Sequence, residues 1–137
     1  MRQALRVLIG AVLFFGLYVV ARAEPTATAV VFYPEANDTI PINSQVFFSA
    51  KLTANPTGGD SNSYEVKIEF YREDPAGIES VLYSTTRFVR PGLGIEVTYM
   101  SSTTIVDQLG TWQFGVRSQS RREGSNDNYT ALASDHH

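Results

Sequence analysis

Residues 64–72 read Tyr-Glu-Val-Lys-Ile-Glu-Phe-Tyr-Arg, and this stretch decides the fold class. Apolar or aromatic residues fall at every second position from Tyr64 to Phe70, with Glu65, Lys67 and Glu69 between them. A period of two is that of a β-strand with one face on a core and one in water. The next residues, Asp-Pro-Ala-Gly at 74–77, suit a type I turn. The chain is therefore predicted to return as a hairpin.

The rest of the chain repeats this pattern of short strands between turn signals. Pro, Gly, Asn, Asp and Ser cluster at intervals of roughly ten residues, which is typical of a sandwich rather than of alternating strands and helices. We predict an all-β fold with two antiparallel sheets and about seven strands. Strands are expected at 28–33, 45–53, 64–72, 78–84, 95–100, 111–118 and 129–133, with 85–89 either continuing the fourth strand or crossing to the other sheet.

A corner motif precedes the sixth predicted strand. Asp107 and Gly110 precede Trp112, and Phe114 follows two positions later. This segment resembles the entry to strand F of immunoglobulin-like domains, in which an aromatic residue bonds back to the backbone. Phe114 stands where antibody domains carry a cysteine, so the chain resembles the disulfide-free immunoglobulin-like domains of exported prokaryotic proteins. The resemblance implies an immunoglobulin-like sandwich and no particular function.

The first 23 residues have the pattern of a secretory signal. Arg2 and Arg6 precede an uncharged run over 7–21, which ends in the small-x-small sequence Ala21-Arg22-Ala23. We expect a signal peptide at 1–23, a sandwich domain at 24–137 and a secreted or periplasmic location. The alternative is a retained helix that anchors the domain facing outward. That layout resembles the envelope-side stator subunits of archaeal motility machines, which hold on to the surface layer.

The side-chain inventory argues against an enzyme. The chain has no cysteine, and its two histidines, His136 and His137, are the last two residues, where we expect a mobile end. No cofactor or metal site is expected. The oxygen-rich loop at 123–128 is interpreted as a solvated turn, with calcium binding as the alternative. A net charge of -3 argues against a nucleic-acid partner.

Two groups of residues are candidates for partner binding. Arg121 and Arg122 lie in a long polar loop predicted over 118–128, and Arg117 stands just before it; all three are assigned to this loop region, which would project from one end of the sandwich. Tyr33, Phe47 and Tyr71 are assigned to outward strand positions, where exposed aromatic residues would mark an interface. Asn37 and Asn128 each begin a glycosylation sequon.

The sequence therefore predicts an exported, non-enzymatic interaction or structural module of the cell envelope. Its partner would be a protein or a surface polymer, bound through a sheet face, an edge strand or the end loops. A membrane would be involved if the N-terminal helix is retained. A further alternative is a self-associating fibre or pilus subunit that exchanges the strand at 26–33.

Overall fold

The computed structural model describes residues 24–137, so the predicted signal at 1–23 lies outside the described residues. This part of the chain forms seven strands and contains no helix that could cross a membrane. The strands are β1 (Thr26–Tyr33), β2 (Gln45–Asn55), β3 (Tyr64–Glu73), β4 (Glu79–Val89), β5 (Ile95–Ile105), β6 (Gln113–Arg122) and β7 (Thr130–His136). The prediction of an all-β fold is confirmed for residues 24–137.

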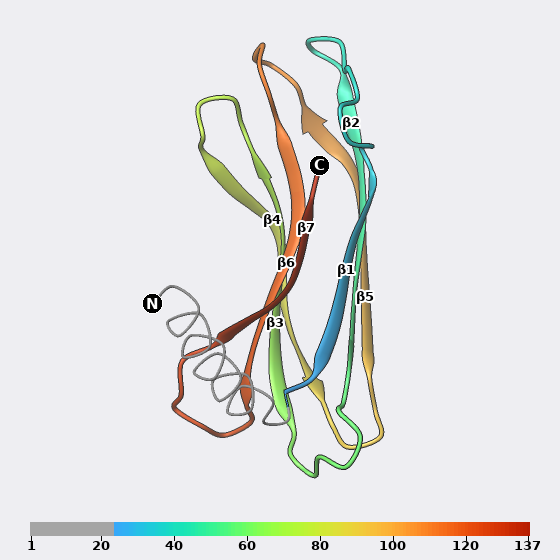
Figure 1. The fold of residues 1–137 in the computed structure, drawn as a ribbon. Coiled ribbons are helices and arrows are strands. Elements are labelled where there is room, and N and C mark those ends of the chain that lie inside the picture. The colour runs from blue at the N-terminus through green and yellow to red at the C-terminus, as the bar shows by residue number, and fades with distance from the viewer. Residues whose placement is uncertain (1–23) are drawn as a thin grey trace, which may run out of the picture.

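The strands form two antiparallel sheets that pack face to face (Figure 1). The smaller sheet has the order β1-β2-β5, and the larger has the order β4-β3-β6-β7. Strand β1, proposed above as an exchanged strand, pairs with β2 of its own chain. The β3–β4 hairpin closes at the predicted turn, where the Asp74 carboxylate accepts hydrogen bonds from Ala76 N and Ile78 N.

Alternation places the apolar residues of both sheets in one core. On β2 the inward positions run from Val46 to Ala54, and on β3 they are Val66, Ile68 and Phe70. Rings fill the middle: Phe48 meets Phe114 edge-on at 5.5 Å between centroids, and Tyr99 lies between the sheets against Phe48 and Phe70. Without a disulfide, this packing is the main source of stability.

The strand limits differ from the prediction in the second half of the chain. Residues 85–89 continue β4 rather than cross to the other sheet, because the whole of β4 pairs with β3. Strand β6 runs on to Arg122, so the predicted loop over 118–128 is shortened to 123–129. Pairing with β3 extends β6, because Glu65 and Arg121 face each other across the ladder.

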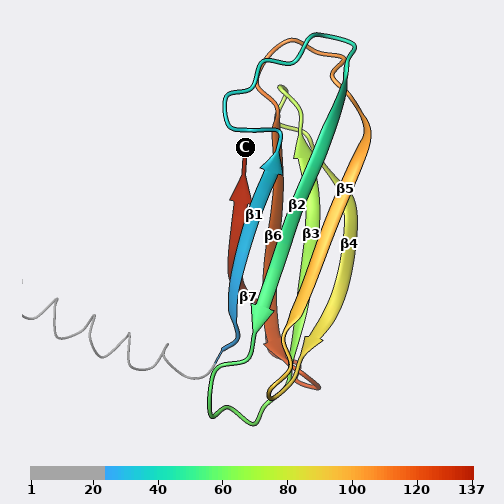
Figure 2. The ribbon, with the colours of Figure 1, turned by 90° about the vertical axis from the view of Figure 1, so that its right-hand side faces the viewer.

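Strands β1 and β7 are edge strands of different sheets and run side by side (Figure 2). The backbone N–H of Val31 donates to Asp135 Oδ2 across the two sheets at 2.8 Å. Next to this contact, β7 bulges: Leu132 and Ala133 face the single residue Ser118 of β6. The Ser118 hydroxyl donates to Ala133 O and accepts from Ala133 N, so both backbone groups are satisfied.

Candidate interaction surface

Three loops meet at the end of the sandwich where β1, β3 and β5 finish (Figure 1). They are the β1–β2 loop (34–44), the β3–β4 turn (74–78) and the β5–β6 loop (106–112). Gly110, at φ 130°, lies so close to the turn that a Cβ at this position would stand 2.7 Å from Pro75 Cβ. The β5–β6 loop therefore rests on the β3–β4 turn.

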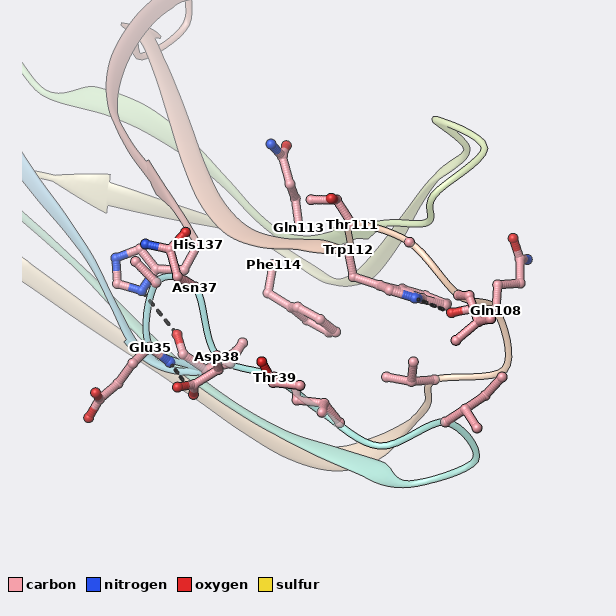
Figure 3. A pocket seen from close by; sticks show the side chains of 17 residues that line it. Glu35, Asn37, Asp38, Thr39, Gln108, Thr111, Trp112, Gln113, Phe114 and His137 are labelled. Carbon is pink, nitrogen blue, oxygen red and sulfur yellow. Dashed lines mark hydrogen bonds between the residues drawn. The ribbon is translucent and has the colours of Figure 1, made fainter.

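A cleft of about 620 Å³ opens between the β1–β2 and β5–β6 loops. This volume lies in the range of roughly 300–1,000 Å³ that ligand pockets occupy. Trp112 and Phe114 lie on one side of the cleft and Thr39 lies on the other (Figure 3). Its apolar lining includes Ile40, Ile42, Val106, Leu109, Trp112 and Phe114.

The corner residue Trp112 is held in place from its own loop. Its indole Nε1 donates to the carbonyl oxygen of Gln108 at 3.1 Å, and Phe114 anchors the following strand in the core. The aromatic residue of the corner thus bonds back to the backbone, as the resemblance implied. Asp107 is exposed and makes no hydrogen bond within residues 24–137, so it takes no part in this corner.

The other wall is an ordered loop. Asp38 Oδ2 accepts from Glu35 N at 2.9 Å, and Asn43 N donates to Val106 O at 2.6 Å. The last residues were predicted to form a mobile end, but the structure pairs them with the sheet. His137 pairs with Phe114 through both backbone groups, and its ring Nδ1 lies 3.0 Å from Pro34 O. The rim of the cleft is therefore fixed by backbone contacts on both sides.

The charge at this end has one sign. Glu35, Asp38 and Asp107 stand in the β1–β2 and β5–β6 loops, and residues 34–44 and 106–112 contain neither Lys nor Arg. Glu35 and Asp38 line the cleft together with apolar residues, of which Leu109 is 83 % exposed and Ile42 47 % exposed, and with polar ones such as Thr39 and Gln108. Two acids on the β1–β2 wall beside exposed apolar side chains favour a ligand that pairs a cation with an apolar group.

Tyr33 and Phe47 lie next to this end, on the outer face of the smaller sheet. Their rings are 5.6 Å apart, and both side chains are nearly half exposed. The ladder between β1 and β2 shifts register at Phe32, so Phe32 and Tyr33 both reach this outer face. The two exposed aromatic residues extend the apolar surface beyond the cleft.

The arginine assignment is corrected by the structure. Arg117 and Arg121 lie within β6, and Arg122 is its last residue, so none of the three belongs to a projecting loop. Arg117 donates to Glu79 at 2.6 Å and to Glu69 at 3.3 Å. Glu carboxylates on the neighbouring strands thus pair with Arg117 on the face of the sheet.

Arg121 makes a similar set of contacts further along the strand. It donates to Glu65 at 3.0 Å, and its guanidinium lies 4.5 Å from the centroid of the Tyr129 ring. Hydrogen bonds from Tyr129 and Arg121 hold the pKa of Glu65 below its usual value. The outer face of the larger sheet is thus a ladder of paired charges, which makes it a poorer candidate for a free binding surface.

The prediction that Tyr71 is an exposed aromatic residue is also corrected. Its side chain is 9 % exposed and does not present its ring to solvent. Its ring lies over Gly115, and the Arg117 guanidinium lies 4.5 Å from its centroid. Burial raises the pKa of Tyr71.

The shortened loop at 123–129 belongs to the opposite end of the sandwich. Within residues 24–137 no group of three or more His, Asp or Glu side chains is placed to hold a metal ion. Both sequon residues, Asn37 and Asn128, are exposed, and Asn37 lines the cleft.

The cleft could not be predicted from the sequence, because its two walls, residues 34–44 and 106–112, are separated by more than 60 residues in the chain. One signal was present: segments 34–44 and 106–112 each combine at least one acid with large apolar residues and have no Lys or Arg. Nothing in the sequence indicates that these two segments face each other.

No protein-family model matches the chain, and no curated protein matches it. Among solved structures, the fold is similar to the putative ApaA protein of Bordetella pertussis, with 16 % identity and a TM-score of 0.50. That match covers 83 % of this chain and 92 % of the other. A match to Bacteroides uniformis beta-glucuronidase has 11 % identity and a TM-score of 0.45, and it covers 82 % of this chain and 12 % of the enzyme. The similarity to the putative ApaA protein concerns the fold alone.

Proposed function

We propose that this chain is an exported, non-enzymatic interaction module of immunoglobulin-like fold that binds a protein segment in the cleft between the β1–β2 and β5–β6 loops. The observation that carries the proposal is the cleft itself, in which exposed apolar side chains lie beside the acids Glu35 and Asp38. The segment would insert a large apolar side chain beside Trp112 and place Arg or Lys near Glu35 and Asp38. Burial of the apolar group supplies affinity, and the charges favour basic partners.

The immunoglobulin-like assignment is supported by the strand order and by the corner. The smaller sheet groups the first, second and fifth strands, and the larger groups the third, sixth and seventh, as in that fold. The fourth strand lies beside the third. The bond from Trp112 to Gln108 supplies the corner.

The non-enzymatic part is supported by the surroundings of His137. Its ring contacts Pro34 O and lies 3.7 Å from Asp135. Within residues 24–137 no Ser or Thr hydroxyl hydrogen-bonds to this ring. His137 therefore does not act as the base of a Ser–His or Thr–His nucleophile pair in this arrangement. Export is supported by the signal pattern at 1–23.

The experiment uses the full chain produced in a secreting host and three synthetic peptides of equal length. One alternates Arg and Leu, one alternates Glu and Leu, and one alternates Arg and Ser. Trp112 is the only tryptophan and lines the cleft, so its fluorescence reports binding. The Arg–Leu peptide should shift the emission saturably, and the other two should bind at least tenfold more weakly.

Leu109→Arg places a cation in the cleft and should abolish binding of the Arg–Leu peptide. Leu109 is exposed, so the variant should fold normally. The matched control is Met100→Arg, an exposed substitution on the smaller sheet away from the cleft. Equal binding of all three peptides, or binding unchanged by Leu109→Arg, would contradict the proposal. Saturable binding of a neutral polysaccharide in place of the peptide would also overturn it.

A further inference from the structure

A rigid turn projects a leucine at the end of the sandwich opposite the cleft. Arg90 and Leu93 close the β4–β5 turn through two backbone hydrogen bonds, of 2.9 and 3.2 Å. Pro91 and Gly92 fill its central positions, and Gly92 has φ 73°, which suits a type II turn. Leu93 is 59 % exposed. A turn fixed in this way loses little conformational freedom when a partner binds it.

The turn carries a cation, Arg90, whereas the charged residues of the two cleft loops are acids. Arg90 opens the turn and Arg87 precedes it on β4, while the nearest acids in the chain are Glu79 at the start of β4 and Glu96 on β5. Arg90 contacts Glu123 at 3.4 Å, but half of its side chain remains exposed. An exposed ion pair of this kind is weak, so Arg90 keeps most of its capacity to pair elsewhere. The turn therefore offers an apolar side chain, Leu93, with one cation, Arg90, on its N-terminal side.

The turn and the cleft lie at the two ends of β5, which begins at Ile95 and finishes at Ile105. Figure 2 shows this strand running the length of the sandwich. A single copy cannot bring its own turn to its own cleft, whereas a second copy placed end to end meets no such obstacle.

We infer that the cleft of one copy receives the β4–β5 turn of a second copy, with Leu93 beside Trp112 and Arg90 beside Glu35 and Asp38. This inference rests on the proposed function, because it names the segment that the cleft binds. The contact joins two different surfaces, so it repeats from copy to copy and builds a linear, head-to-tail assembly. No strand exchange is needed, and β1 stays in its own sheet.

The test is sedimentation velocity of the full chain over a hundredfold range of concentration. The wild-type chain should form a ladder of oligomers that lengthens with concentration. Leu93→Asp removes the turn's apolar group, and Leu109→Arg blocks the cleft; each variant alone should be monomeric. Both positions are exposed, and unchanged circular dichroism and melting temperature would show that the variants are folded.

Mixing the two variants gives the decisive result. The Leu93→Asp copy keeps a working cleft, and the Leu109→Arg copy keeps a working turn. An equimolar mixture should therefore form a dimer and nothing larger. Met100→Asp, the matched exposed control, should leave the wild-type ladder intact. A monomeric wild-type chain at all concentrations, a mixture without dimers, or a ladder in the mixture would each overturn the inference.

Charge reversal tests the orientation of the contact. Arg90→Glu should shorten the ladder, and the double reversal Arg90→Glu with Asp38→Lys should restore part of it; no restoration would contradict the placement of Arg90. If the wild-type chain stays monomeric while the Arg–Leu peptide still binds in the cleft, the inference fails and the proposed function stands. If neither occurs, both fail.

Discussion

The ring of Tyr71 lies against the backbone of Gly115, so that a Cβ added at residue 115 would stand 2.5 Å from Tyr71 Cζ. The two residues face each other across the β3–β6 ladder. Arg117, two positions along β6, covers the ring from one side. The absence of a side chain at 115 is therefore what allows an aromatic ring to lie flat on the outer face of the larger sheet.

Gly115→Ala should destabilise the fold by about 1–3 kcal/mol, because the new methyl group must displace the Tyr71 ring from a packed site. Chemical denaturation followed by circular dichroism measures the change. Gly58→Ala is the matched control, since a Cβ at Gly58 meets no atom within 4 Å. A loss of stability at position 115 no larger than at position 58 would show that the ring moves freely.

Tyr71 also shows how far the sequence could lead. Alternation along β3 correctly predicted its face, because a period of two follows from the strand backbone alone. Its burial depended on Gly115 and Arg117 of β6, more than 40 residues away, and alternation does not reveal which residues a strand pairs with. The same limit explains the arginines: Arg117 and Arg121 sit on the sheet because Glu79, Glu69 and Glu65 face them.

The seven strands were predictable because each carries its own local pattern and turn signal. The cleft was not predictable, because it arises where the 34–44 and 106–112 loops meet. Asn43 N and Val106 O bring these loops together, and backbone hydrogen bonds between distant loops leave no trace in residue type.

Ser118→Ala should destabilise the fold by about 1–3 kcal/mol, because it leaves the N–H and C=O of Ala133 without their partner at a partly buried bulge. The effect is measured by thermal unfolding. The control is Ser134→Ala, because Ser134 is an exposed serine on β7. The Ser118 variant should also exchange its Ala133 amide faster than the wild type. Equal melting temperatures for the two variants would mean that water replaces the hydroxyl without cost.

Asp135→Ala should loosen β1 from β7 while leaving the core intact, because it removes the acceptor for Val31 N. Hydrogen exchange at the Val31 amide should accelerate by roughly tenfold, which corresponds to the loss of about one hydrogen bond. Asp135→Asn keeps a side-chain carbonyl and should retain most of the protection. If Val31 exchanges equally slowly in all three proteins, pairing with β2 rather than Asp135 protects this edge.

Acid should weaken the fold through the carboxylates of the larger sheet. The hydrogen bond from Arg117 holds the pKa of Glu79 below its usual value of 4.5, and hydrogen bonds from Tyr129 and Arg121 do the same for Glu65. Both groups therefore hold their protons less tightly in the folded chain than in the unfolded chain. Their contribution to stability is complete above pH 4.5 and is lost as the pH falls through the lowered values.

The melting temperature should therefore fall as the pH is lowered from about 5 to about 3. In the double variant Glu65→Gln with Glu79→Gln, the melting temperature at pH 7 should be lower and its dependence on pH over this range should be shallower. Glu96→Gln serves as the control, because Glu96 is exposed and makes no ion pair within residues 24–137. A double variant that loses stability in acid as steeply as the wild type would assign the acid sensitivity to other carboxylates, with the Arg117 and Arg121 pairs contributing little.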